Sequence, residues 1–422
     1  MAREYKDSGI EWIGLIPKEW EFGKYKYIGT FVKGKLPKDQ NNENKGLPII
    51  GASEMLGKEY RTYTLDLNVP ICSPIDILIL WDGANAGIVA NGCDGVVSST
   101  TVKYSCNDSR FNNQYLYYLL KNAEPFFKSK VNGTTIPHMN SKYIDEYICI
   151  IPPLSEQEKI ADYLDKVCGE ADEMIALQEK MIEELKVYKQ SIITEAVTKG
   201  LNPNVPMKNS GIDWIGEIPE GWKVVKLSLL TSKIGSGSTP IGGANVYVSE
   251  GVKFLRSQNV YFEGLDLSDV AHITDKIDKE MKGTRVLPGD VLLNITGGSI
   301  GRCYYVDETL GKANVNQHVS IIRPKDIDTK YLKYSLQSSL GQHQVSLLQT
   351  GGNREGLSAA ALCNFKMLLP SKDEQQAIAS FLDTKCSEID SLIAIKQQKI
   401  AELKEYKKSV IYEYVTGKKE VI

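Results

Sequence analysis

The chain has 422 residues, of which 42% are hydrophobic and 24% charged, and its formal net charge is -3 at pH 7. This predicts an ordinary soluble protein of two or three domains and excludes a uniformly basic DNA-coating protein. The N-terminus has no apolar core of a signal peptide, and the longest apolar run, Ile77 to Trp81, is far too short to span a bilayer. The eight cysteines form no CxxC pair, so we expect a cytoplasmic protein without a structural metal.

A short phrase near the N-terminus occurs a second time in the middle of the chain. Residues 7–20 read DSGIEWIGLIPKEW, and residues 209–222 read NSGIDWIGEIPEGW, in a chain with only five tryptophans. The match indicates that a whole unit is duplicated. The repeated Trp12, Trp20, Trp214 and Trp222 could stack on nucleic-acid bases, but because both copies share them, a structural or subunit-docking role is predicted.

The globular stretch after each phrase shows a looser match. PIDILILWDGANAGIV (74–89) lies over PGDVLLNITGGSIGRC (288–303), and each apolar run predicts a buried strand that leads into a tight turn. Residues 132–154 and 350–372 then occupy matching places. The halves are therefore expected to share a fold while differing in the polar residues they carry.

A long repeat closes each half. Residues 156–200 align without gaps to residues 374–418, and apolar residues recur every seven positions, as at Leu164 and Ala171. This predicts two helices of roughly 40 residues, each about 60 Å long, paired as an antiparallel coiled coil. Gln178 and Lys396 interrupt the apolar row at one matching position. These two polar side chains either fix the register of the two helices or extend past the interface between the helices into solvent.

No catalytic motif is visible. The glycine-rich stretch 234–243 lacks the Gly-Lys-Ser/Thr of a P-loop, no Asn/Asp-Pro-Pro-aromatic motif of a DNA methyltransferase occurs, and neither GxSxG nor HExxH is present. The histidines at 138 and 318 have no visible partner for metal binding or base catalysis. We expect a protein that has no cofactor and performs no chemistry alone.

Together these features resemble the specificity subunit of Type I restriction-modification systems. The resemblance rests on the twice-used SGI[ED]WIG.IP..W phrase, ANVNQHVSIIRP (313–324), TGGNREGL (350–357) and the P…EQ..IA..LD start of each helix. It implies an α+β fold with two target-recognition domains in a pseudo-twofold tandem repeat, separated by the two helices. The boundaries expected are 1–151 and 201–369 for the domains, and 152–200 and 370–422 for the helical segments.

The resemblance also implies a function. Each recognition domain would read half of a bipartite sequence in double-stranded DNA. The helices would set the spacing and dock two methylase subunits that methylate adenine N6, and restriction subunits can join through those. The chain itself would be a non-catalytic subunit without membrane contact.

The candidate base-reading residues have side chains that can hydrogen-bond to base edges, and nearby Lys and Arg are expected to position the DNA backbone. In the second half they are Ser236, Ser238, Thr239, Arg256, Gln258, Asn259, Asn316, Gln317, His318, Asn353 and Arg354. In the first half they are Lys33, Lys35, Ser53, Glu54, Ser99, Thr100, Thr101, Thr134, Thr135 and His138. Each could instead form a loop or cap hydrogen bond. The two sets differ, which predicts two different half-sites.

Two other classes of function remain open from the sequence. A coiled-coil scaffold with two protein- or glycan-binding domains would bind without regard to DNA sequence and in high salt. An autonomous nuclease would cut DNA in a metal-dependent way by itself, although no nuclease motif supports it.

Overall fold

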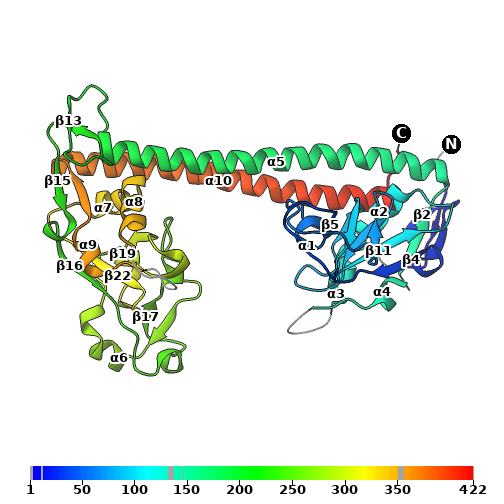
Figure 1. Ribbon diagram of the computed structural model, residues 1–422, viewed down its shortest axis with the longest axis horizontal. Helices are drawn as coiled ribbons and strands as arrows, with labels where there is room; N and C mark the ends of the chain where they lie inside the picture. The colour runs from blue at the N-terminus through cyan, green and yellow to red at the C-terminus, as the bar shows by residue number, and fades with distance from the viewer. Residues whose placement is uncertain (1–2, 11–12, 132–136, 146, 350–355, 422) are drawn as a thin grey trace. The chain divides into compact units, whose positions relative to one another are not determined.

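The computed structural model describes residues 3–10, 13–131, 137–145, 147–349 and 356–421. The chain divides into two compact units, Met1–Glu179 with Gln397–Ile422, and Lys180–Lys396. Each unit contains one globular domain, here the first and the second domain, and a part of each of the two long helices labelled α5 and α10 in Figure 1.

Both predicted long helices are confirmed. Helix α5 spans Leu154–Lys199 and α10 spans Lys372–Val415, which makes them 46 and 44 residues long. Prolines precede both helices, and each ends beside a glycine in the left-handed conformation, Gly200 (φ 76°) or Gly417 (φ 69°). A glycine takes this conformation without the steric cost that a side chain adds, so it is the usual residue after a helix.

The helices are antiparallel within each unit. In the first unit Asp172 of α5 accepts a 2.5 Å ion pair from Lys407, and Tyr163 lies 4.5 Å from the ring of Tyr414. In the second unit Lys189 pairs with Asp390 at 2.7 Å. Lys189 and Asp390 are the repeat equivalents of Lys407 and Asp172, so the same ion pair is made twice.

The first domain is built on two four-stranded sheets. One is antiparallel, in the order β4-β11-β8-β9, and the other is mixed, in the order β6-β5-β10-β7. The strands are β4 Gly29–Lys33, β5 Leu47–Ile50, β6 Tyr63–Thr64, β7 Ile71–Cys72, β8 Ile77–Leu80, β9 Val89–Asn91, β10 Gly95–Val97 and β11 Thr101–Cys106. A hairpin of β1 (Tyr5–Asp7) and β2 (Leu15–Pro17) carries the repeated phrase, and β3 (Glu21–Lys24) pairs with β12 (Ile148–Ile151). The helices are α1 Ala52–Met55, α2 Asn113–Asn122, α3 Glu124–Ser129 and α4 Ser141–Asp145.

The second domain repeats this arrangement. Its antiparallel sheet has the order β16-β22-β19-β20, and β17 pairs in parallel with β21, as β5 does with β10. The strands are β13 Met207–Asn209, β14 Glu217–Pro219, β15 Lys223–Lys226, β16 Thr231–Ser236, β17 Val252–Leu255, β18 Ala271–Ile273, β19 Val291–Asn294, β20 Cys303–Tyr305, β21 Ala313–Val315, β22 Val319–Pro324 and β23 Lys366–Leu369. The helices are α6 Asp275–Glu280, α7 Thr329–Gln337, α8 Ser339–Leu348 and α9 Ala359–Cys363. The predicted duplicated α+β fold is therefore confirmed.

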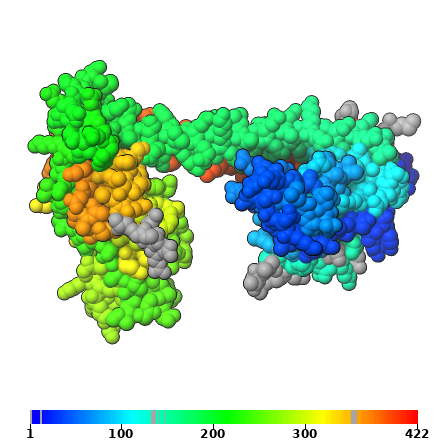
Figure 2. Space-filling model, in the orientation of Figure 1, coloured from blue at the N-terminus to red at the C-terminus, as the bar shows by residue number. Residues whose placement is uncertain are grey.

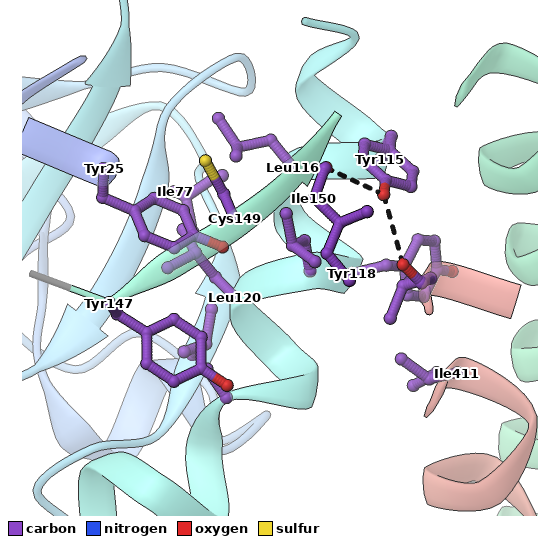
Figure 3. Packing of buried hydrophobic residues seen from close by; sticks show 14 of the residues in the cluster. Tyr25, Ile77, Tyr115, Leu116, Tyr118, Leu120, Tyr147, Cys149, Ile150 and Ile411 are labelled. Carbon is purple, nitrogen blue, oxygen red and sulfur yellow. Dashed lines mark hydrogen bonds between the residues drawn. The ribbon is translucent and has the colours of Figure 1, made fainter. Parts of the chain in front are cut away.

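Each domain packs against both long helices within its own unit. In the first unit one buried cluster joins domain residues such as Tyr25 to Leu164 of α5 and Ile411 of α10. Figure 3 shows this packing, with Tyr115 of α2 between Ile150 and the end of α10. The Tyr115 hydroxyl donates toward the carbonyl oxygens of Ile150 (3.2 Å) and Val415 (3.3 Å).

The second unit makes the equivalent contacts. Tyr331 of α7 donates to the carbonyl of Leu368 at 2.9 Å and lies 3.5 Å from that of Val197. The last carbonyls of a helix lack partners within the helix. A buried tyrosine thus supplies a donor at the end of one long helix in each unit.

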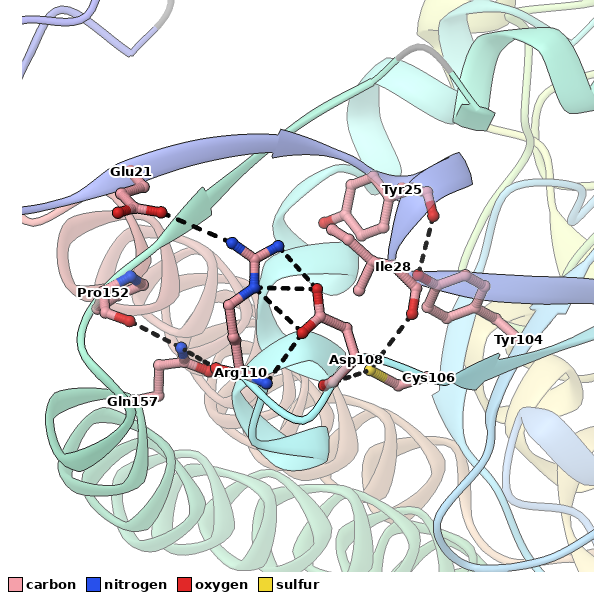
Figure 4. A network of polar contacts seen from close by, with 9 residues as sticks. All are labelled: Glu21, Tyr25, Ile28, Tyr104, Cys106, Asp108, Arg110, Pro152 and Gln157. Atoms are coloured by element: carbon pink, nitrogen blue, oxygen red, sulfur yellow. Dashed lines mark hydrogen bonds and ion pairs between the residues drawn. The ribbon is translucent and has the colours of Figure 1, made fainter.

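The same polar arrangement is repeated at the start of each long helix. Gln157 donates to the carbonyls of Pro152 (2.8 Å) and Arg110 (2.9 Å) and accepts from the amide of Asn112 (2.9 Å). Figure 4 shows this network beside the ion pair of Arg110 with Asp108. Gln375 repeats it with the carbonyl of Pro370 (3.0 Å) and the amide of Asp328 (2.8 Å).

The repeated tryptophans belong to the same junction. The indole nitrogen of Trp20 donates to Glu156 at 2.9 Å, and that of Trp222 donates to Glu374 at 3.0 Å. Both rings are buried. The structural role predicted for Trp20 and Trp222 is confirmed. Trp214 is 37% exposed and lies beside His343, and Trp12 lies outside the described residues. Across the residues that the structure covers, no helix is both long and apolar enough to cross a bilayer.

Candidate nucleic-acid interface

Most of the predicted base-reading residues lie at one end of the sheets of each domain, on loops or on the strand and helix ends that adjoin them. We name these loops A to E in chain order. In the first domain they are residues 33–35, 51–54, 81–83, 98–101 and 137–139. In the second domain they are residues 236–239, 256–259, 295–299, 316–319 and 356–357.

Backbone hydrogen bonds tie the loops of the first domain together. Loop A bonds to loop D, loop D to the strand before loop B, loop C to loop D, and loop E to loop C. The amide-to-carbonyl pairs are Gly34 to Thr101 (2.9 Å), Ser98 to Ile50 (3.1 Å), Trp81 to Thr100 (2.8 Å) and Met139 to Trp81 (3.0 Å). Five loops that are distant in the sequence therefore form one surface.

The second domain makes the same bonds at equivalent positions. The pairs are Gly237 to Val319 (2.9 Å), Asn316 to Leu255 (3.0 Å), Ile295 to His318 (2.9 Å) and Leu357 to Ile295 (2.9 Å). This shared pattern makes Asp82 equivalent to Thr296 and Thr100 equivalent to His318. The scaffold of the loops is thus duplicated, while the side chains on it are not.

A glycine is required where loop A crosses loop D. A Cβ added to Gly34 would lie 2.1 Å from the carbonyl oxygen of Ser98, and one added to Gly237 would lie 2.0 Å from that of Val315. Both distances are far inside contact distance to backbone atoms. Each crossing is therefore possible only because loop A has no side chain there.

Most of the predicted residues are accessible on this surface. The exposed ones are Lys33, Lys35, Ser53, Thr100, His138, Ser236, Ser238, Thr239, Gln258 and Gln317, while Glu54, Ser99, Arg256 and His318 are half-buried. Thr134, Thr135, Asn353 and Arg354 lie outside the described residues, in segments that precede loop E. The structure therefore gathers side chains selected from separate sequence stretches.

Three predicted residues are buried and serve the loops themselves. Thr101 is fully buried, Asn316 accepts from the amide of His318, and Asn259 accepts from the amide of Arg256 at 2.9 Å. Asn259 also donates to the carbonyl of Asp266 at 2.9 Å. Asn259 and Asn316 hold loop backbone, and the Thr101 hydroxyl lies 3.3 Å from that of Ser98 within loop D, so we assign these three to loop positioning and withdraw them from the base-contacting set.

Loop C of the first domain contributes a residue that the sequence reading missed. The carboxylate of Asp82 lies 3.1 Å from the ammonium of Lys33 and also contacts Nδ1 of His138. Three loops therefore meet at one side chain. The sequence carries a signal for it, because Asp82 follows the buried strand in the stretch that aligns with NITGG.

Loop C of the second domain has a neutral counterpart. The hydroxyl of Thr296 lies 2.6 Å from Nδ1 of His318. The other ring nitrogen of His318, Nε2, lies 3.0 Å from the side-chain amide nitrogen of Gln317. Gln317 in turn accepts from Thr239 of loop A. A chain of polar side chains thus links loops A, D and C.

Loop B of the second domain is held by an acidic residue outside the loops. Asp269 accepts from Gln258 at 2.7 Å, and Arg256 contacts its carbonyl at 2.6 Å and its carboxylate at 3.3 Å. Two predicted residues of loop B, Arg256 and Gln258, are therefore oriented by one aspartate. Among the described residues, no group of three or more His, Cys, Asp and Glu side chains is placed to hold a metal ion.

The comparisons with known proteins agree with this architecture. A family model described as Type I restriction modification DNA specificity domain matches residues 17–187 and 219–405. The chain is 32% identical to the Type I restriction enzyme MjaVIII specificity subunit of Methanocaldococcus jannaschii, over 98% of this chain and 96% of that protein. It is 24% identical to the Type I restriction enzyme EcoBI specificity subunit of Escherichia coli, over 83% of this chain and 76% of that protein.

A solved structure has the same fold. A chain from work on complex assembly and conformational transition of the type I R-M system superposes with a TM-score of 0.66 at 16% identity, covering 95% of this chain and 98% of that one. The chain therefore belongs to the family of Type I restriction-modification specificity subunits, with two DNA specificity domains. Such subunits are the non-catalytic components of Type I systems.

Proposed function

We propose that each domain reads one half of a bipartite DNA target through its loops A to E. The observation that carries this proposal is the duplicated hydrogen-bond scaffold with different exposed side chains. One scaffold that presents Lys33, Thr100 and His138 in the first domain presents Ser236 and His318 in the second. Side chains of these types form hydrogen bonds with base edges or phosphates, so different sets select different half-sites.

We further propose that the helices set the spacing of the half-sites and dock two adenine-N6 methylase subunits. Exposed apolar side chains recur on them at repeat-equivalent positions. Met174 and Leu392 are 46% and 47% exposed, Leu177 and Ile395 are 55% and 63%, and Tyr188 and Tyr406 are 57% and 50%. Figure 2 shows the surface of α5 uncovered over much of its length.

A duplicated apolar surface is the feature expected for a partner that binds twice. Large exposed apolar side chains mark protein interaction sites when they cluster. Met174, Leu177 and Tyr406 belong to the first unit, and Leu392, Ile395 and Tyr188 belong to the second. On this proposal the complex acts in the cytoplasm, and restriction subunits join it through the methylases.

The experiment is genome-wide mapping of adenine methylation by single-molecule sequencing. Cells would express this chain with its neighbouring methylase, or the methylase alone as the control. We expect a split motif, methylated on both strands only when this chain is present. Absence of a new motif, with a methylase that is active beside another specificity subunit, would contradict the proposal and favour the scaffold alternative.

A second arm of the same experiment tests docking. The double variant Leu177→Asp with Ile395→Asp places a charge on each exposed surface and should abolish methylation while leaving the chain folded. The control is the double variant Lys186→Asp with Lys404→Asp. These two lysines are also exposed, repeat-equivalent residues of the helices, but they are not apolar. Equal loss in both double variants would argue against the apolar surface as the docking site.

A further inference from the structure

The first domain places a carboxylate among residues that are proposed to contact DNA. The side chain of Asp82 is 17% exposed, while those of its partners Lys33 and His138 are 46% and 56% exposed. A carboxylate repels the phosphates of DNA, so its presence at this surface needs a reason. Its oxygen atoms face Lys33 of loop A and His138 of loop E.

The contacts fix the orientation of both partners. A lysine side chain has four rotatable methylene groups and loses its freedom only when its ammonium is held. The contact with Nδ1 of His138 places the proton there and leaves Nε2, the far side of the ring, for another partner. A held side chain loses less conformational entropy on binding than a free one, which increases both affinity and discrimination.

The second domain supplies an independent observation at the equivalent position. Thr296 holds Nδ1 of His318 at 2.6 Å, although His318 comes from loop D and His138 comes from loop E. In both domains the second residue after the buried strand, β8 or β19, contacts a histidine ring. The position is thus used in the same way with different partners.

We propose that Asp82 is a specificity-determining positioning residue of the first domain. Its carboxylate holds the Lys33 ammonium and the His138 imidazole in the orientation in which they contact the first half-site. Thr296 does the same for His318 in the second domain. This inference rests on the proposed function of the loops.

The test compares the methylation motif of wild type and Asp82→Asn in the complete complex with its methylase. Asparagine keeps the size of the side chain but cannot form an ion pair with Lys33. We expect discrimination at one or more base pairs of the first half-site to fall at least about tenfold, the effect of losing one good base contact. The second half-site should be unchanged, which also shows that the variant is folded and assembled.

Non-specific DNA binding distinguishes positioning from simple damage. Asp82→Asn removes a negative charge from the surface and frees Lys33 for a phosphate, so binding to DNA without the target should not weaken, and its salt dependence should be equal or steeper. The matched control Asp94→Asn removes an exposed charge at the opposite end of β10 from loop D, and should leave both half-sites unchanged. A second variant, Thr296→Val, should broaden only the second half-site.

Each outcome decides between the possibilities. An unchanged first half-site in Asp82→Asn, or loss of discrimination in both halves together, overturns the inference. If Asp82→Asn does not fold, an unchanged second half-site in Thr296→Val overturns it. If wild type itself yields no split motif, the proposed function fails rather than this inference.

Discussion

The junction of Trp222 with Glu374 offers a test of how the second domain is fastened to its helices. We expect Trp222→Phe to destabilise the second unit. The indole donates to a carboxylate at 3.0 Å, and hydrogen bonds to charged groups contribute about 1.5–3 kcal/mol. The smaller phenyl ring also leaves a gap beside Gly200, whose Cβ position lies 3.3 Å from the indole, and this adds about 1 kcal/mol.

Trp20→Phe in the first unit is a matched comparison. Glu156 would keep its ion pair with Arg3, which lies 2.7 Å away, so its charge stays partnered after the indole is lost. The expected cost is about 1–2 kcal/mol for Trp20→Phe, which leaves a similar gap beside Gly417, against about 2.5–4 kcal/mol for Trp222→Phe. The difference arises from the cation that only the first junction has among the described contacts.

The assay is hydrogen exchange resolved to peptides, under increasing urea, because it reports the opening free energy of each unit separately. A double-mutant cycle with Glu374→Leu, which removes the acceptor, isolates the hydrogen bond from the packing loss. The reasoning would be refuted if Trp222→Phe cost less than Trp20→Phe, or if the larger loss of protection appeared in the other unit.

Two more predictions concern the second domain. Burial lowers the pKa of Lys333 to about 8, against the opposing attraction of Asp383, so its folded form binds fewer protons than its unfolded form between pH 8 and pH 10.5. The contribution of Lys333 to stability should therefore rise by about 3 kcal/mol across that window, so Lys333→Met should be more stable than wild type at pH 7 and lose this advantage by pH 10.5. Urea denaturation of both proteins at several pH values checks this, and an equal pH dependence in the two would contradict it. Gly237→Ala should lower stability by about 1–3 kcal/mol in thermal unfolding and weaken discrimination at the second half-site, because the added Cβ would meet the backbone of Val315. Gly235→Ala is the control, because the space around its Cβ position is open, and it should change neither quantity.

The helices and the duplication could be predicted because their signals are periodic and local. Leu164 and Ala171 lie seven residues apart, are both buried, and belong to a run without proline. Period and repeat are read directly from a sequence. The stretches that carry the candidate residues could also be selected, because the two halves align around the strand before loop C. That these stretches lie together follows only from the backbone hydrogen bonds between them.

The rest depended on contacts between residues that are far apart in the chain. Trp20 meets Glu156 across 136 residues, and no local pattern joins them. Thr101 and Asn259 have suitable side chains for base contacts, but burial directs those side chains to the loops. Asp82 could not be predicted from the sequence, because a carboxylate on a surface proposed to bind DNA is understandable only once Lys33 and His138 are seen beside it.

The central claim is that loops A to E of each domain face the bases of one half-site. It is tested most directly by site-specific photo-crosslinking of the complete complex on its methylation target. Ser53 and Gln258, which occupy exposed and equivalent places on loop B, would carry the crosslinker. Asp94 and Glu308, exposed residues away from the loops, would serve as controls.

The account predicts that Ser53 and Gln258 crosslink to bases of different half-sites and that the control positions yield no crosslinks to bases. Crosslinking of both loop positions to the same half-site, or base crosslinks from the control positions at a similar yield, would contradict it.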